Sequence, residues 1–131
     1  MRAQALAPRY PRWVLSVLVV EDNADLRDMY QEILALGGHS VRLAETAGEA
    51  LTALAAERPD VVLLDLGIAG GVATLLESIG AGTPIILASG ARDLPERATA
   101  LGAAAYLLKP FGPEQLIDTV ERVASARREQ P

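Results

Sequence analysis

The chain has 131 residues, of which 50% are apolar, 12 are basic and 17 are acidic, and it contains no cysteine. That length indicates one domain with one core, and the net charge of −5 argues against nucleic-acid binding, which needs clustered lysine and arginine. The lack of cysteine excludes disulfides and thiolate chemistry, and no apolar run reaches the roughly twenty residues of a membrane span, so we expect a cytoplasmic protein without a membrane partner.

The chain is predicted to begin with a flexible leader or linker at residues 1–12, where arginines and prolines occur without periodicity. The domain is predicted over residues 13–128, with a tail at 129–131. Its first element is an apolar strand at residues 15–20, which three polar residues follow at once. A helix comes next, because apolar residues recur at helical spacing until a pair of glycines at 37 and 38.

The next strand and helix are also short. His39, the only histidine, follows the two glycines, and we expect it in a surface turn. Residues 40–44 alternate like a strand. Thr46, with Glu49 three residues later, is a capping-box signature that opens a second helix, and Pro59 ends it.

The second half of the chain continues the alternation. A fully apolar strand ends at Asp65, as expected for a strand covered on both faces. A glycine-rich loop then leaves room only for a short third helix at 72–79. The fourth strand ends at Ser89, and Asp93 suits the cap of the fourth helix. The remaining elements are a fifth strand at 103–108 and a last helix from Gly112-Pro113 to Arg128.

Five strands that alternate with five helices predict an α/β fold, in which right-handed crossovers wind an open parallel sheet with helices on both faces. Ligands of such sheets bind at the carboxyl ends of the strands. We therefore expect five residues to converge at that edge of the sheet, namely Glu21, Asp22, Asp65, Ser89 and Lys109.

Three neighbouring carboxylates repel one another unless a cation lies between them, and an all-oxygen cluster suits Mg²⁺. The metal would neutralise the acids and leave one oxygen of Asp65 free as a nucleophile toward phosphorus. Lys109 would balance the charge of the phosphoryl oxygens, and Ser89 would donate a hydrogen bond to one of them.

Four segments, in this order and spacing, resemble the receiver domain of two-component response regulators over about residues 15–127; they are VLVVEDN, VVLLDL, ILASG and LLKPF. The resemblance implies a flavodoxin-like sheet of strand order 2-1-3-4-5. It also implies a phosphorelay protein, rather than a turnover enzyme, that catalyses its own phosphorylation and dephosphorylation. Its implied partners are a sensor histidine kinase or phosphotransfer protein and a downstream protein target.

The resemblance also assigns roles to single residues. Asp65 would be the phosphoacceptor, and Glu21 and Asp22 the acidic pair that binds Mg²⁺ together with Asp65 and the backbone carbonyl of Gly67. Ser89 and Tyr106 would be the switch residues that change a protein-binding surface. Lys109 would be the family's lysine, joined to Pro110 by a cis bond.

The sequence departs from the family pattern after Asp65. Family members usually carry a proline four residues after the phosphoacceptor, where this chain has Ala69, and the segment from Asp65 to Ser89 is several residues shorter than is typical. A shortened third helix is therefore expected. The departure places the geometry of the ligand at Gly67 in question, because ordering a glycine-rich loop costs entropy.

Alternative interpretations remain at this point. Asp22 or Asn23 could serve only as a helix cap, and Tyr106 could be ordinary packing instead of a switch. The whole protein could be a receiver-like binding module that no longer accepts phosphate. It could also be a small Mg²⁺-dependent aspartyl-phosphate phosphatase, although Gly67 stands where such enzymes, which resemble the haloacid dehalogenase family, carry a second aspartate.

Overall fold

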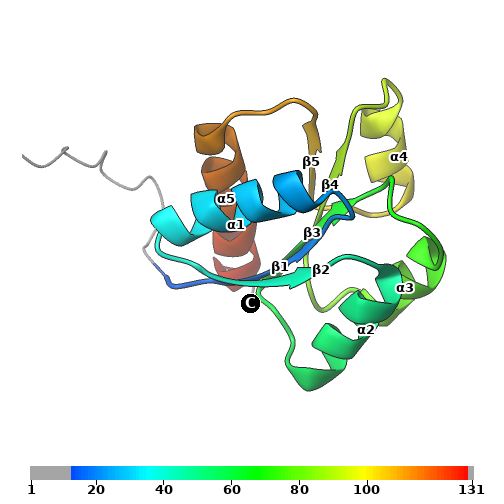
Figure 1. The fold of residues 1–131 in the computed structure, drawn as a ribbon, viewed down its shortest axis with the longest axis horizontal. Helices are drawn as coiled ribbons and strands as arrows, with labels where there is room; N and C mark the ends of the chain where they lie inside the picture. The colour runs from blue at the N-terminus through cyan, green and yellow to red at the C-terminus, as the bar shows by residue number, and fades with distance from the viewer. Residues whose placement is uncertain (1–12, 130–131) are drawn as a thin grey trace, which may run out of the picture.

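The computed structural model describes residues 13–129 and contains five strands and five helices that alternate along the chain (Figure 1). The strands are β1 (Ser16–Val20), β2 (Ser40–Ala44), β3 (Val61–Asp65), β4 (Ile85–Ser89) and β5 (Ala105–Leu108). The helices are α1 (Ala24–Leu36), α2 (Ala47–Ala56), α3 (Val72–Ile79), α4 (Leu94–Ala100) and α5 (Pro113–Glu129). The leader predicted at residues 1–12 lies outside the described residues, as do residues 130–131 of the predicted tail.

All five strands are parallel and lie in the order β2-β1-β3-β4-β5, which confirms the predicted fold class. In the register of the sheet, Val20 lies opposite Leu64 and Asp65 lies opposite Ala88. The carboxyl ends of β1, β3 and β4 therefore reach the same edge. Within the described residues, no helix has the length and apolar character that crossing a bilayer requires.

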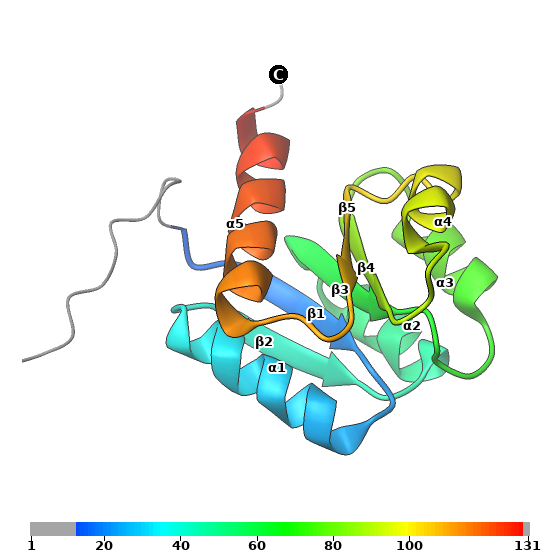
Figure 2. The same cartoon turned by 90° about the horizontal axis from the view of Figure 1, so that it is seen from above.

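The sheet lies between two helical layers, α1 with α5 on one face and α2, α3 and α4 on the other (Figure 2). Alternate residues of each strand face opposite layers: Val17 and Val19 belong to the cluster beneath α1 and α5, whereas Leu18 and Val20 belong to the cluster on the other face. A central strand such as β3 must be apolar at successive positions because both of its faces are covered.

The helix cap predicted at Thr46 is confirmed, the alternative that Asp22 or Asn23 caps the first helix holds for Asn23, and the cap expected at Asp93 is not formed. The side chain of Asn23 accepts a hydrogen bond from the Leu26 N–H and caps α1, and the Thr46 hydroxyl accepts from the Glu49 N–H at 3.1 Å and caps α2. The expected cap by Asp93 is wrong: its side chain makes no capping hydrogen bond. Its ψ of 14° departs from the extended conformation that points a capping side chain at the helix N–H groups.

The short third helix is confirmed with the predicted bounds, Val72–Ile79. It lies beside α2, and Figure 1 shows α4 on its other side, further along the sheet. The loop before α3 runs through two glycines of positive φ, 65° at Gly70 and 46° at Gly71. A Cβ at Gly71 would lie 3.1 Å from the Cβ of Ala47, so this loop packs closely on the first turn of α2.

Arginine side chains close the C-terminal ends of these helices. Arg42 donates to the carbonyl of Ala53 at 2.8 Å and to that of Glu57 at 2.6 Å, at the end of α2. Arg58 donates in the same way to the carbonyls of Ser78 and Ile79 at the end of α3. Each guanidinium binds carbonyls at the C-terminal end of a helix and complements the negative end of the helix dipole.

His39 is not in a surface turn, contrary to the prediction. It is only 7% exposed, its Nδ1 accepts a hydrogen bond from the Leu15 N–H at 3.2 Å, and its Nε2 lies 2.8 Å from Oε2 of Glu121. Because Nδ1 accepts, the proton of the neutral ring belongs on Nε2, which donates to Glu121 on α5. The imidazole thus joins the start of β1 to α5.

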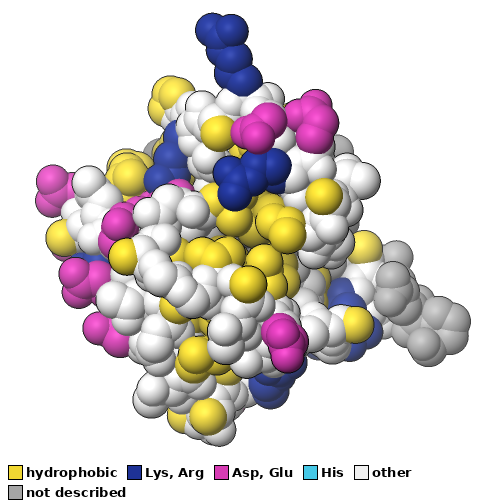
Figure 3. Space-filling model, turned by 90° about the vertical axis from the view of Figure 1, so that its right-hand side faces the viewer, with side chains coloured by type: hydrophobic (Ala, Val, Ile, Leu, Met, Phe, Trp, Pro, Cys, Tyr) yellow, Lys and Arg dark blue, Asp and Glu magenta, His cyan; other side chains and the backbone are white. Residues whose placement is uncertain are grey.

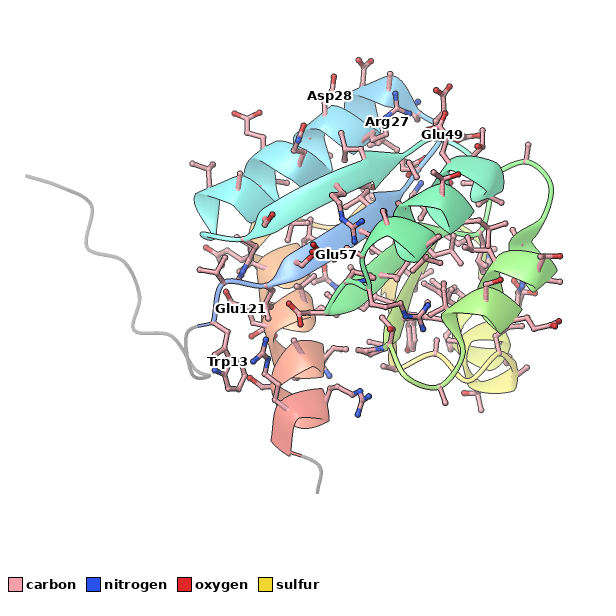
Figure 4. All side chains as sticks on the ribbon, turned by 90° about the horizontal axis from the view of Figure 1, so that it is seen from below. Trp13, Arg27, Asp28, Glu49, Glu57 and Glu121 are labelled. Atoms are coloured by element: carbon pink, nitrogen blue, oxygen red, sulfur yellow. The ribbon has the colours of Figure 1, made fainter. Side chains whose placement is uncertain are left out.

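The N- and C-terminal ends of the described chain are also joined. The guanidinium of Arg128 lies 4.6 Å from the centre of the Trp13 ring, and Figure 4 shows Trp13 beside α5. Arg128 is also 3.4 Å from Oδ1 of Asp60, whose Oδ2 accepts a hydrogen bond from the Ser16 N–H at 2.8 Å. These contacts lie at the edge of the sheet where the strands begin.

Candidate functional site

Three carboxylates meet at the opposite edge, where the strands end. Glu21 and Asp22 follow β1 directly, and Asp65 is the last residue of β3. One carboxylate oxygen of each residue lies within 4.8 Å of the others. Glu21 and Asp65 are buried, at 1% and 8% exposure, while Asp22 is exposed. The structure therefore brings together the three acids that the sequence analysis selected, although two of them lie more than forty positions from the third.

Both oxygens of Glu21 have hydrogen-bond partners. Oε1 accepts from Nζ of Lys109 at 2.9 Å, and Oε2 accepts from the Asn23 N–H at 3.2 Å. Burial raises the pKa of Glu21 most strongly, the charge of Asp65 raises it further, and the two hydrogen bonds oppose the rise. A cation among the three acids would therefore favour the ionised form of Glu21.

Lys109 is the only lysine in the sequence. Its Nζ lies 3.3 Å from Oδ1 of Asp65 as well as 2.9 Å from Glu21, and the Lys109-Pro110 bond is cis, as the resemblance implied. Burial alone would lower the pKa of Lys109, but the hydrogen bond to Glu21 and the charge of Asp65 outweigh it and raise the pKa. The ammonium is therefore charged at neutral pH and placed between the two buried acids.

Gly67 lies against the carboxylate of Asp65. A Cβ at this position would be 3.2 Å from Oδ2 of Asp65, and Gly67 itself is exposed to solvent. A residue with a side chain would have to displace the carboxylate or move the loop. The glycine therefore leaves space open beside the acid on its solvent side.

The two predicted switch residues, Ser89 and Tyr106, are less closely associated with the three acids than Lys109 is. Ser89 is half-buried at the end of β4, next to β3, and its Oγ accepts a hydrogen bond from the Ala91 N–H at 3.0 Å. Tyr106 lies on β5 and is 43% exposed. Within residues 13–129, no hydrogen bond joins either side chain to the three carboxylates.

Two residues beside the site were missed by the sequence analysis. The ring of Tyr30, on α1, stacks on Phe111 with centroids 5.4 Å apart. Burial raises the pKa of Tyr30, and the charges of Lys109, Glu21 and Asp65 also act on it. Arg27 donates to the backbone carbonyl of Glu21. Neither position shows a distinctive pattern, because each contact depends on the packing of α1 against the strand ends.

The donor set fits a hard divalent cation. All the available ligand atoms are oxygens, and one carboxylate oxygen of each acid lies within reach of a common point. The exposed position of Asp22 leaves an open side for water and for a phosphoryl group. The chain is a doubly wound α/β domain with an acidic cluster and a lysine at the carboxyl edge of its sheet, which is where domains of this class bind their ligands.

The comparison with known families agrees with this class. The sequence matches the response regulator receiver domain family over residues 17–121. The chain therefore belongs to the receiver domains of two-component response regulators.

The curated relatives are longer response regulators. The response regulator MprA of Mycolicibacterium vanbaalenii is 36% identical over 77% of this chain and 46% of that protein. MprA of Mycobacterium avium is 34% identical over 89% of this chain and 53% of that protein. The chain thus spans about half the length of the curated relatives it matches.

Solved structures show the same fold. A CheY-like receiver domain protein from Methanospirillum hungatei has a TM-score of 0.81 at 25% identity and covers 91% of this chain and all of that chain. The receiver domain of NtrX from Brucella abortus has a TM-score of 0.74 at 33% identity, with 82% of this chain and 97% of that chain covered.

Proposed function

We propose that this receiver domain, predicted over residues 13–128, accepts a phosphoryl group on Asp65 in a cytoplasmic phosphorelay. The donor would be the phosphohistidine of a sensor histidine kinase or of a phosphotransfer protein. The observation that carries the proposal is the position of Asp65: its carboxylate is buried, lies among two other acids that call for a cation, and is 3.3 Å from the Lys109 ammonium.

The proposed transfer forms one bond and breaks one. An oxygen of the Asp65 carboxylate attacks phosphorus, the P–N bond to the donor histidine breaks, and its electron pair remains on the imidazole nitrogen. The product is an acyl phosphate on Asp65. In dephosphorylation, water attacks phosphorus, the carboxylate leaves, and inorganic phosphate departs. The domain would thus catalyse its own modification without being a turnover enzyme.

Glu21, Asp22, Asp65 and the backbone carbonyl of Gly67 are the groups that would hold Mg²⁺. When bound, this ion would supply charge neutralisation for the acids and for the phosphoryl oxygens. Lys109 already stands between two of the acids and would contact a phosphoryl oxygen on Asp65. The Ser89 hydroxyl, at the end of the neighbouring strand, accepts from the Ala91 N–H and would donate its own O–H to another oxygen.

The proposed output is a change in a protein-binding surface over α4, β5 and α5. Tyr106 and Leu108 of β5 are both 43% exposed, and Leu101 after α4 is 41% exposed. Figure 3 shows the adjoining face, which carries α3 and α4, and hydrophobic side chains gather there as well. Movement of Ser89 toward a phosphoryl group would alter the space beside Tyr106, so both residues are proposed as the switch that a downstream protein reads.

The experiment is phosphorylation by a small donor. The protein is incubated with Mg²⁺ and acetyl phosphate, and its intact mass is measured. We expect the wild type to gain the mass of one phosphoryl group and Asp65→Asn to gain none. Asp60→Asn, which changes the aspartate at the other end of the same strand, is the matched control and should be phosphorylated like the wild type.

The shortened segment after Asp65 favours one second candidate, a receiver-like binding module that no longer accepts phosphate, since α3 has only eight residues. A wild type that remains unmodified in the same experiment would support this candidate over the phosphoacceptor. Repeated turnover of unrelated phosphomonoesters would instead support an aspartyl-phosphate phosphatase. The residue that would act as general acid in such a phosphatase is absent here, because Gly67 occupies its position.

A further inference from the structure

Arg27 binds the backbone on both sides of Asp22. Its Nη1 donates to the carbonyl oxygen of Glu21 at 2.9 Å and lies 3.4 Å from the carbonyl oxygen of Asp22. Figure 4 shows Arg27 at the start of α1, next to the connection from β1. The side chain is half-buried, and its own N–H continues the helix by donating to the Asn23 carbonyl at 2.9 Å. One guanidinium nitrogen therefore contacts the backbone carbonyls of both residues of the acidic pair.

A cation is unexpected at this place in a helix. The first turn of a helix carries partial positive charge, so acidic residues stabilise it and basic residues cost stability there. In α1 the first turn also holds Asp25, which follows the usual preference, whereas Arg27 does not. Departures from a local rule of this kind concentrate at functional sites. The two contacts with carbonyl oxygens offset the unfavourable position of the Arg27 charge in the first turn of the helix.

The two acids of the loop are held in different ways. The carboxylate of Glu21 is fixed directly, because Lys109 and the Asn23 N–H each bind one of its oxygens. The carboxylate of Asp22 is exposed, so its position depends on the backbone that carries it. The carbonyls bound by Arg27 belong to the two peptide units that flank the Cα of Asp22. Fixing both peptide units fixes the direction in which this side chain leaves the chain.

We propose that Arg27 is a positioning residue, which holds the two peptide units around Asp22 and thereby sets the affinity of the acidic site for a divalent cation. The inference rests on the proposed function, since it assumes that the three carboxylates bind such an ion. It adds a residue that is not itself a metal ligand, and it predicts the direction in which the Mg²⁺ affinity changes when that residue is replaced.

The direction of the change in Mg²⁺ affinity distinguishes a positioning role of Arg27 from the effect of its charge alone. A positive charge beside a cation site repels the cation, so loss of the Arg27 charge by itself would tighten Mg²⁺ binding. Loss of the two carbonyl contacts would weaken binding, because Asp22 would have to be ordered when the ion arrives. Groups that do not bind the metal themselves but orient its ligands typically contribute a factor of about ten or more to the affinity for the metal. Positioning therefore outweighs the charge effect, and the net change should be weaker binding.

The test is a titration of the ¹⁵N-labelled full chain with MgCl₂ at constant ionic strength, followed by amide chemical shifts. We expect Arg27→Met to raise the Kd for Mg²⁺ about tenfold. Arg27→Lys keeps the charge and one donor nitrogen and should fall between the wild type and Arg27→Met. Arg42→Met is the matched control, because Arg42 also binds two carbonyls but at the far end of α2, and its Kd should equal that of the wild type.

An Arg27→Met protein that is folded, as judged by its dispersed amide spectrum, and whose Kd is equal to or lower than that of the wild type would overturn the inference. If Arg27→Met does not fold, the comparison of Arg27→Lys with the wild type decides, and an unchanged Kd there would overturn the inference. A wild type whose amide signals do not respond to Mg²⁺ would overturn the proposed metal site itself. These failures are distinguishable, because only the last one appears without any substitution.

Discussion

The Nζ of Lys109 lies 2.9 Å from Oε1 of Glu21, so the cation that follows β5 is held by the buried acid that follows β1. The same ammonium is 3.3 Å from Asp65, while Asp22 has no such neighbour among the described ion pairs. With Glu21 ionised, three carboxylates and one ammonium leave two negative charges in a partly buried pocket. A divalent ion bound among these carboxylates would offset this excess charge.

Removal of the Asp65 charge should therefore stabilise the metal-free domain. Burial is the main cause of the raised pKa of Glu21, and the charge of Asp65 raises it further, as repulsion between two neighbouring acids would. We expect Asp65→Asn to increase the free energy of unfolding by about 1 kcal/mol in EDTA, as substitutions at strained functional sites often do. Urea unfolding measures this, with Asp60→Asn as the control, which should not gain stability because it removes the charge that pairs with Arg128. A less stable Asp65→Asn would contradict the electrostatic interpretation.

Tyr30 should make the stability fall in alkaline solution. Burial raises the pKa of this phenol above its ordinary value of 10.0, so the folded state holds the proton more tightly than the unfolded state. The unfolded chain then releases a proton first as the pH rises, and stability is lost above about pH 10. Tyr30→Phe keeps the ring on Phe111 and removes this loss. The measurement is urea unfolding of the wild type and Tyr30→Phe in EDTA between pH 8 and 11. Parallel dependences of the free energy of unfolding on pH for the two proteins would refute the prediction.

The buried His39 should contribute measurably to stability. Its ring accepts the Leu15 N–H and donates to Glu121, so His39→Ala leaves an N–H without its partner and removes a packed ring. We expect a loss of about 1–3 kcal/mol. Glu121→Gln keeps an acceptor oxygen for Nε2 and should cost much less. Equal losses in the two variants, measured by chemical denaturation at pH 7.5, would show that the contact with the Glu121 carboxylate and not the buried N–H contact dominates.

Gly71 should resist substitution more than other loop glycines. Its φ of 46° is unfavourable for residues with a side chain, and a Cβ would lie 3.1 Å from the Cβ of Ala47. We expect Gly71→Ala to destabilise the domain by about 1–2 kcal/mol. Gly82→Ala is the matched control, since the φ of Gly82 is not positive and a Cβ there would meet no atom within 4 Å. A shift of the thermal midpoint in Gly82→Ala as large as in Gly71→Ala would argue against a strained loop.

The sequence was sufficient for those features that depend on local patterns. Periodicity and glycines placed the elements, so α3 was predicted at its observed bounds of Val72–Ile79. The rule that parallel strands deliver ligands at their carboxyl ends was sufficient to bring Asp65 to Glu21 and Asp22. The cap at Thr46 was predicted correctly because a cap is decided within four residues of the chain.

Features that depend on long-range packing were missed. His39 looked like a turn residue because its partner, Glu121, lies on α5, and no local pattern links the two. Tyr30 and Arg27 belong to ordinary helical positions until α1 is placed against the strand ends. The cap expected at Asp93 failed for the opposite reason, since the local signal was present but the loop after β4 set a different backbone conformation.

The contact between Trp13 and Arg128 has a consequence for how the domain is attached to anything else. Both residues lie at the edge where the strands begin, which is opposite to the acidic pocket. A polypeptide joined through either residue therefore leaves the domain at the edge of the sheet opposite the three carboxylates. Affinity tags, fluorophores or neighbouring domains placed there would leave the approach to Asp65 clear for a visiting phosphodonor.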